Sequence, residues 1–568
     1  MSMATKKQAP KKDVVHVKFL PKDPLVARRD GLWPLDRAMV YPTAGSGPCG
    51  PHAVVVDYNA DLDVRFAPAR LQRNGSFAGL ARLSREKLLA DFHFHQVNVW
   101  AIVERTLEKI EHIHLLGRAI PWANRDGRLL LLPHAGYSEN AFYDRGTGGI
   151  HFFYFEGFEG KPVFTCLSHD IITHELGHAV LDGLKPGYNE VSSPETAGFH
   201  EYFGDAVAMM ASLSTRETAF QVVKDAPEKL DAHNVVSAIA SEFGAALRGL
   251  PDEDYLRGAW NQRTMESLVG TFEEHDWSEV LTGIYYDLLQ YLYRRFYKDN
   301  LQRGGETALN KRQGYAMGAL MQAATSTAGV MFRAIDYCPP VDLRYADYAE
   351  AVLRAQEVAY PVDDLGIRAQ LVKLFTARGI PLRKPDEKTR DAIQRALRAE
   401  SVAETATTPA DAYRFLDLHR AVFGIPYEAN LAVNAVYRTN KHTPSGYRPP
   451  KEHIVEFTWS EDVALEGKRF GALDGTMLPL WCGGTLVFDT NSNFLHRAMV
   501  LPTEQRKREL KAYAAYLVEA GELAMAPDIN GNGAPSTGHA RVRATVANGR
   551  VSLCRIAAMR HARGEGEA

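Results

Sequence analysis

Hydrophobic positions along the chain change their spacing as the sequence proceeds. Between residues 13 and 89, short apolar runs alternate with Gly, Pro and Asp, a pattern that predicts strands and turns. The expected strands lie at 14–19, 52–58 and 63–71. From residue 88 to residue 113 apolar residues recur at i, i+3 and i+4, which predicts one long helix. Two further strands are expected at 128–134 and 150–155.

Beyond residue 168 the apolar pattern becomes almost wholly helical. The predicted helices span 168–183, 195–210, 235–249, 278–296, 314–335, 345–360 and 365–379. Their aromatic and methionine residues fit core packing of a helical lobe better than a cofactor site. We place the end of this region near residue 383.

The sequence after residue 383 has a different character. Residues 384–410 are polar and charged, and they are expected to form a connector that is part helix. Residues 411–568 mix strand patterns at 428–438, 453–459, 485–490 and 540–546 with a charged helix at 503–522. This part predicts a mixed α/β domain of unknown role.

The segment SHDIITHELGHAVLDG carries the clearest chemistry in the chain. His174 and His178 are separated by one helical turn, so both imidazoles point to the same side and can bind one metal ion. Glu175 lies one position along, where its carboxylate can accept a proton from water. The H-E-x-x-H pattern therefore predicts a Zn²⁺ site.

The next predicted helix, ETAGFHEYFGDAVAMM, supplies the remaining groups of such a site. Glu201 is the expected third metal ligand of a His₂Glu centre with an open position. Asp205 follows at i+4 on the same face, where it can accept the other N–H of a ligating imidazole. The simpler alternative is an acidic stripe beside two surface histidines.

These motifs resemble the thermolysin-like zinc metallopeptidases, a branch of the gluzincins. The resemblance rests on H-E-x-x-H at His174 to His178 followed by E-x-x-x-D at Glu201 to Asp205. An Asn-Ala-Phe-aromatic stretch from Asn140 and Ala141 to Tyr143 lies upstream. Leu247-Arg248 and the His275-x-x-Ser278 element follow downstream in the order of the family. The resemblance covers about residues 90–383.

The resemblance implies roles for several of these residues. Asn140 and Ala141 would hold the substrate backbone, and Arg248 would bind a substrate carbonyl. His275 would stabilise the oxyanion of the tetrahedral intermediate, and the more weakly matching Tyr188 would also contact it. Without the family, a lone arginine or histidine at such positions is more often a surface charge or a helix cap.

The resemblance also implies two residues that shape the substrate pocket and one that could bind calcium. In the family, positions matching Ile171 and Leu247 wall the pocket for the side chain after the scissile bond, so a large apolar side chain is expected there. Asp170 matches a carboxylate near the active site that binds calcium in secreted members. Because the segment after Asp205 is poor in acidic residues, the family's double calcium site is not expected.

The expected fold class is therefore α+β. It comprises a flexible basic tail at 1–12, a β-rich segment at 13–89 and a gluzincin, thermolysin-like catalytic domain at 90–383. That domain would have a β-rich N-terminal lobe, active-site helices and a helical C-terminal lobe. The connector at 384–410 and the mixed α/β domain at 411–568 complete the expected organisation.

Composition and charge restrict the partners. The 568 residues are 45% hydrophobic and carry a formal net charge of −3, with acidic and basic residues interspersed. Neither nucleic acid nor a membrane is therefore expected as a partner. Five scattered cysteines without a C-x-x-C pair and an N-terminus without an apolar signal core predict a cytoplasmic protein.

Two functions follow from the sequence. The first is a zinc-dependent endopeptidase acting on a peptide or protein substrate, with Glu175 as general base. The second is a zinc-binding scaffold that keeps the peptidase fold and has a gated or inactive cleft. Either one allows a protein partner or self-association through the C-terminal region.

Overall fold

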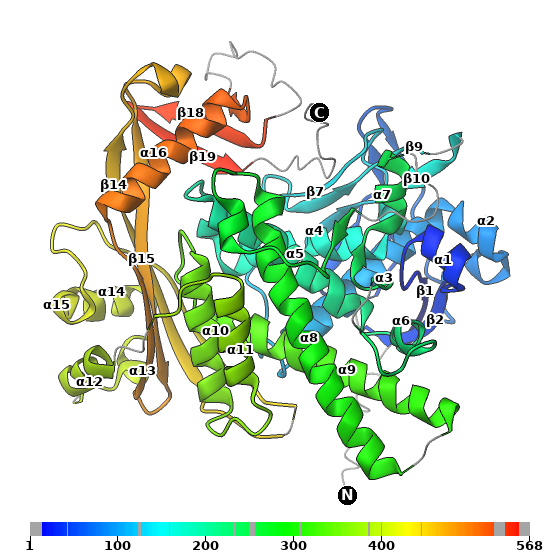
Figure 1. Cartoon of the computed structure of the whole chain (residues 1–568). Helices are drawn as coiled ribbons and strands as arrows, with labels where there is room; N and C mark the ends of the chain where they lie inside the picture. The colour runs from blue at the N-terminus through cyan, green and yellow to red at the C-terminus, as the bar shows by residue number, and fades with distance from the viewer. Residues whose placement is uncertain are drawn as a thin grey trace, which may run out of the picture.

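The structure is a computed structural model of the whole chain (Figure 1). It describes residues 14–41, 44–122, 127–157, 160–230, 233–248, 256–305, 308–383, 387–398, 400–444, 446–526 and 540–555. The predicted tail at 1–12 lies outside these described residues. Helices and strands are both abundant, and they confirm a mixed α and β fold.

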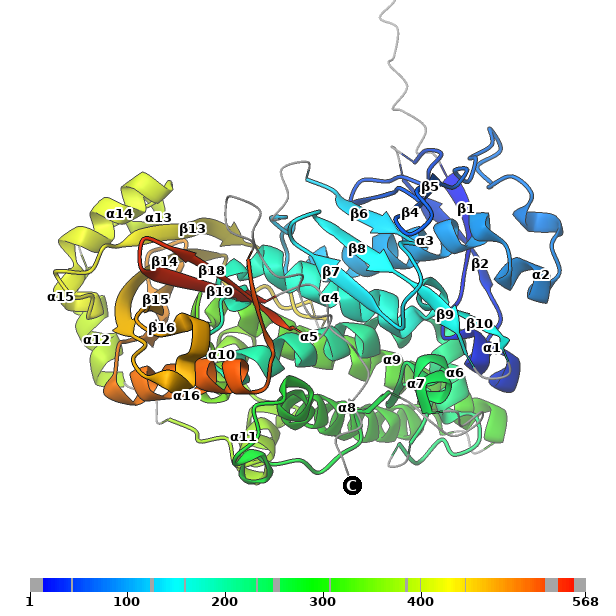
Figure 2. The same ribbon diagram turned by 90° about the horizontal axis from the view of Figure 1, so that it is seen from above.

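The N-terminal part is built from small sheets around one long helix (Figure 2). Its main sheet has the order β3-β6-β8-β7, in which β7 is an edge strand paired antiparallel with β8. The strands are β3 (Ala53–Val55), β6 (Leu129–Leu132), β7 (Ala141–Asp144) and β8 (Gly149–Phe152). Strand pairs are formed by β1 (Val14–Phe19) with β2 (Leu35–Val40), β4 (Tyr58–Asn59) with β5 (Val64–Arg65), and β9 (Tyr154–Glu156) with β10 (Pro162–Phe164). The helices here are α1 (Pro24–Asp30), α2 (Arg85–Leu89) and α3 (Phe92–Glu111).

Two buried helices, α4 (His169–Leu184) and α5 (Pro194–Ser212), cross at the centre of the molecule. Serine caps begin both: the hydroxyl of Ser168 accepts from the Ile171 N–H, and that of Ser193 accepts from the Thr196 N–H. The helices approach closely because glycine lies at their contact. A Cβ on Gly177 would come within 2.7 Å of the Gly204 Cα atom. This crossing brings the predicted motifs on the two helices together.

Helices cover the rest of the first 380 residues. They are α6 (Arg216–Val223), α7 (Ser241–Arg248), α8 (Glu274–Gly304), α9 (Leu309–Arg333), α10 (Tyr345–Ala359) and α11 (Ile367–Ala377). The prediction of a helix at 235–249 is wrong for the first half of that range. There β11 (Ala238–Ile239) pairs with β12 (Arg257–Gly258), and Ala240 has a φ of 54°. That left-handed conformation cannot continue a helix, so α7 begins only at Ser241.

The C-terminal part is a twisted sheet flanked by helices. The sheet runs β13-β14-β15-β19-β18-β17, and β16 also pairs with β15. Its strands are β13 (Ala432–Thr439), β14 (Glu452–Ala464), β15 (Met477–Asp489), β16 (Phe494–Val500), β17 (Leu523–Met525), β18 (Val542–Ala547) and β19 (Arg550–Arg555). The helices are α12 (Glu387–Ala396), α13 (Val402–Thr405), α14 (Pro409–Leu418), α15 (Arg420–Phe423) and α16 (Glu504–Glu519).

Two hydrophobic cores divide the chain near residue 383. The first consists mainly of residues from Val15 to Ile380, and Ile454 and Val487 join it from the C-terminal sheet, so the β-rich segment at 13–89 shares its core with the helices that follow. The second consists of Val191 and residues from Ile393 to Leu553. The predicted connector at 384–410 is therefore more than a linker, because the apolar faces of α12 and α13 belong to this second core.

Buried ion pairs join the C-terminal sheet to the first core. The ammonium of Lys185, just after α4, lies 2.7 Å from Glu456 of β14. Lys441 lies 2.7 Å from Asp336 and 3.0 Å from Glu452. Pairs of this kind are costly to break because a lone buried charge would remain. The C-terminal part is thus fixed against the helices beside the candidate site. No helix in the described part of the chain is long and apolar enough to cross a membrane.

Candidate metal centre and its cleft

Helix α4 presents the side chains of His174, Glu175 and His178 where it packs against α5. The Nε2 atoms of His174 and His178 lie 3.1 Å apart, as expected for residues one turn apart. The side chain of Glu175 is buried, and one of its carboxylate oxygens accepts from the N–H of Tyr143 at 3.0 Å. Strand β7 therefore holds Glu175 at the edge of the sheet.

Helix α5 adds two carboxylates to the same place. An Oε atom of Glu201 lies 3.4 Å from His174 Nε2, and the other lies 3.5 Å from His178 Nε2. Asp205 accepts a hydrogen bond of 3.0 Å from His174 Nδ1. That bond places the His174 proton on Nδ1, so its Nε2 lone pair faces His178 and Glu201. The structure thus brings together the groups predicted from both helices.

The donor set of this site fits a zinc ion. Two imidazole nitrogens and one carboxylate converge in the N and O chemistry that Zn²⁺ prefers. Glu201 Oε1 is buried, and none of the described residues donates a hydrogen bond to it. A buried carboxylate oxygen without a hydrogen-bond donor lowers the stability of the fold, and a bound cation removes this cost by pairing with the oxygen. His174, His178 and Glu201 would hold that ion.

No family model matches this chain, and no curated protein matches its sequence. The chemistry of the site is therefore judged from its own atoms.

Sequence reasoning missed Arg257, which lies in β12 beside the metal-ligating groups. Its guanidinium donates to Glu201 at 2.9 Å and lies 3.1 Å from Asp205. The same guanidinium nitrogen that faces Asp205 also lies 3.1 Å from His174 Nδ1. Its local sequence gives no signal, since β12 is only two residues long. The arginine predicted for a role near the site, Arg248, ends α7, and its side chain lies outside the described part of the structure.

His275 reaches the site from the first turn of α8. Its Nε2 lies 3.2 Å from Glu201, and its Nδ1 lies 2.8 Å from Glu273. Burial lowers the pKa of His275, but the two carboxylates outweigh burial and raise that pKa to about 10. These contacts place the His275 imidazole beside the candidate metal ligands, where its N–H can donate to negative charge that develops in front of it.

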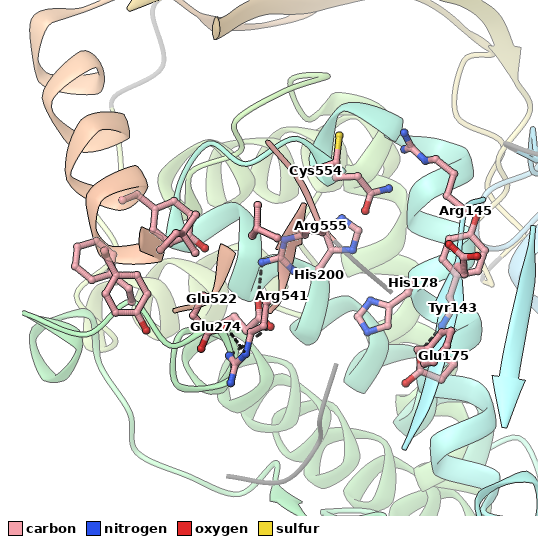
Figure 3. Close-up of a pocket in the computed structure, with 18 residues that line it drawn as sticks. Tyr143, Arg145, Glu175, His178, His200, Glu274, Glu522, Arg541, Cys554 and Arg555 are labelled. Atoms are coloured by element: carbon pink, nitrogen blue, oxygen red, sulfur yellow. Dashed lines mark hydrogen bonds and ion pairs between the residues drawn. The ribbon is translucent and has the colours of Figure 1, made fainter. Parts of the chain in front are cut away.

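A pocket opens in front of Glu175 and His178 (Figure 3). Strand β7 forms one wall. The C-terminal part forms the opposite wall, with Arg541 and Arg555 directed toward Glu274. The remaining lining residues from that part are Tyr513, Tyr516, Leu517, Glu522, Val542 and Cys554. The cleft is thus composite, and the domain of unknown role supplies half of it.

A much smaller cavity lies beside His174. Its other lining residues are Ile171, Ile239, Ala240 and Leu256, together with the charged Asp170 and Arg257. Leu247 packs partly buried against the first core and is not among the residues that line this cavity. Leu256 lines it instead, because the chain after α7 returns to pair with β11.

The structure contradicts the prediction that Tyr188 contacts substrate. Tyr188 is fully buried, and its hydroxyl donates to the Pro339 carbonyl at 2.7 Å. It therefore packs in the core and does not line the cleft. Asn140 precedes the edge strand β7 and Ala141 begins it; both are buried, and Asn140 Oδ1 accepts from the Ala141 N–H. In the described pocket the edge-strand lining begins at Phe142.

Asp170 lies one turn before His174, and it is paired with a lysine. The Lys22 ammonium forms an ion pair with the Asp170 carboxylate, and both side chains are almost completely buried. Ser212 and the Ala240 N–H also donate to Asp170, at 3.0 and 3.1 Å. Burial raises the pKa of Asp170, but Lys22 outweighs burial and lowers it below its usual range. An internal cation therefore neutralises the carboxylate that resembles a calcium ligand.

Proposed function

We propose that this protein is a zinc-dependent endopeptidase of the thermolysin-like type. The observation that carries the proposal is the buried Glu201 Oε1, which lacks a donor among the described residues and faces the imidazoles of His174 and His178. The pocket in front of these groups supports it, because an edge strand forms one wall. An extended peptide can add to such an edge through its backbone.

Each side chain has a role that its position supports. Bound zinc would supply Lewis acidity, which allows water to lose a proton near neutral pH. Glu175 accepts that proton at its carboxylate as the oxygen of water bonds to the carbonyl carbon. An N–H of His275 donates to the developing oxyanion. When the C–N bond breaks, Glu175 delivers the proton to the leaving amine.

The apolar pocket beside His174 indicates the preferred substrate. Ile171, Ile239 and Leu256 line it beside Asp170 and Arg257, so a large apolar side chain for which the pocket opens would be buried against hydrocarbon. Arg257 lies at the rim of this pocket and points toward the site, where it can donate to a substrate carbonyl. We propose that cleavage occurs before large apolar residues.

The proposed activity is tested by removing and restoring the metal. The purified chain is dialysed against a chelator, and cleavage of a random fluorogenic peptide library is followed before dialysis, after dialysis and after adding Zn²⁺. We expect cleavage to disappear on dialysis and return with about one equivalent of zinc at this site, with apolar residues after the scissile bond.

Two results would contradict this proposal. A folded, zinc-loaded protein that cleaves no peptide would favour the scaffold function, in which the composite cleft binds a partner. Charged residues after the scissile bond would refute the role assigned to the apolar pocket.

Arg541 is expected to position His275 from the C-terminal part. Its guanidinium lies 2.9 Å from the Glu273 oxygen that also binds His275 Nδ1. The Arg541→Gln variant should lower kcat by about 10-fold with KM and zinc content unchanged, because small misplacements of a reacting group slow the chemical step. Steady-state kinetics on one library peptide measure this.

The matched control for Arg541 is Arg550→Gln. Arg550 lies on neighbouring β19, and its side chain is half exposed and pairs with Asp462 outside the cleft. The control should keep wild-type kcat, and Arg541→Lys should recover part of the loss. Equal kcat in Arg541→Gln and wild type would show that Arg541 serves only the packing of the C-terminal part.

A further inference from the structure

A second group of metal-ligating side chains lies in the core of the N-terminal part, away from the cleft. His95 comes from α3, His134 follows β6, and Cys166 lies in the turn before α4. One ligand atom from each of them lies within 4.8 Å of the others. All three side chains are completely buried, which is unusual for a pair of histidines.

The outer nitrogen of each imidazole is held by an acceptor. His95 Nε2 lies 2.8 Å from the Leu89 carbonyl oxygen, which can only accept a hydrogen bond. His134 Nδ1 lies 2.9 Å from the carboxylate of Asp57, which also accepts from Gln96 at 2.7 Å. These contacts place the single proton of each neutral ring on its outer nitrogen.

The inner nitrogens then face each other with lone pairs. His95 Nδ1 and His134 Nε2 lie 2.8 Å apart. Two lone pairs at this distance repel each other unless a cation or an additional proton lies between them. At the candidate zinc site the inner nitrogens of His174 and His178 are 3.1 Å apart, and Asp205 holds the outer nitrogen of His174. The two clusters share one pattern, in which an outer acceptor orients an imidazole toward a common centre.

We propose that His95, His134 and Cys166 form a second metal site, for a thiophilic d¹⁰ ion such as Zn²⁺ or Cu⁺. Two imidazoles and one thiolate suit these ions, whereas Mg²⁺ and Ca²⁺ require oxygen ligands. The Cys166 thiol releases its proton to solvent when its sulfur bonds to the metal, because only the thiolate is a good ligand.

Aromatic rings surround the cluster and keep it dry. Phe92 stacks on His134 with ring centroids 4.2 Å apart, and Phe164 lies 4.7 Å from the His95 ring. Phe66 meets the edge of His134 at 5.6 Å. Such a closed, apolar setting is typical of a structural site rather than a catalytic one. The ion would tie α3 and the end of β6 to the turn that leads into α4.

The alternative occupant is a proton. A protonated His134 could donate to both Asp57 and His95, which would give a buried ion pair without any metal. Metal content and the identity of the ligand atoms distinguish the two cases.

Cobalt spectroscopy distinguishes this cluster from the cleft site. The full chain is produced in a defined medium with Co²⁺, so that the metal is present during folding. A thiolate ligand gives Co²⁺ an intense charge-transfer band in the near ultraviolet, whereas the cleft site offers only nitrogen and oxygen ligands. We expect the band and two metal ions per chain in wild type, and no band and one ion in Cys166→Ser.

Cys338→Ser is the matched control, because Cys338 is equally buried and its thiol donates to the Ala334 carbonyl. It should keep both the band and two ions. Should Cys166→Ser not fold, metal-edge X-ray absorption of wild type replaces it, and a sulfur neighbour at about 2.3 Å is then expected. A folded wild type with neither the band nor a sulfur neighbour would overturn the proposal, whether or not the cleft binds zinc.

Discussion

The Glu175→Gln variant is expected to lose peptide hydrolysis by a factor of about 10³ to 10⁴ while it keeps its zinc. Glutamine has nearly the same shape as glutamate, so α4 and the imidazoles of His174 and His178 should stay in place. Glutamine cannot accept a proton from water, however, so no protonated side chain forms at position 175 to deliver that proton to the leaving amine. This one substitution therefore tests the proposed general base without changing the proposed metal ligands.

This expectation is checked by kcat/KM on a fluorogenic peptide and by metal analysis of the same preparation. Glu156→Gln is a suitable control because it makes the same chemical change at an exposed position of β9. That variant should have wild-type activity. Loss of zinc from Glu175→Gln would indicate a structural role for the carboxylate, and full activity would exclude it as the base.

The second large effect concerns stability. Lys22→Met should lower the free energy of unfolding by about 3 to 5 kcal/mol, because it leaves the Asp170 carboxylate buried without its cation. Lys22 and Asp170 are each 1% exposed, so water cannot replace the lost charge. Asp23 is also buried nearby, and burial together with Asp170 raises its pKa. Removing Lys22 therefore affects two carboxylates.

Urea titration of wild type, Lys22→Met, Asp170→Asn and the double variant measures this effect. The double variant should be more stable than Lys22→Met, since the neutral amide removes the uncompensated charge. Arg414→Met is the control, because the Arg414 side chain is largely exposed in its pair with Asp411 and such pairs contribute little. A loss below about 1 kcal/mol in Lys22→Met would show that the pair is not a major source of stability.

The sequence by itself determined the parts of the site that depend on local periodicity. His174, Glu175 and His178 share one helical turn, and Glu201 and Asp205 share another, so their relative directions follow from 3.6 residues per turn. The long helix predicted at 88–113 is found as α3 (Phe92–Glu111) for the same reason. Ile171 could also be placed because it lies one turn before His174.

Only the tertiary structure decided the contacts between residues that lie far apart in the sequence. Arg257 reaches Glu201 from a two-residue strand, and Arg541 reaches Glu273 from the C-terminal sheet. Tyr188 was predicted to contact substrate, but it lies in the core, because spacing in the sequence does not say which side of a turn faces the cleft. The spacing of apolar residues does not indicate the pairing of Lys22 with Asp170. Such contacts result from the packing of segments that lie far apart in the sequence, and the energy of that packing is spread over many residues, so it leaves no local signal in the sequence.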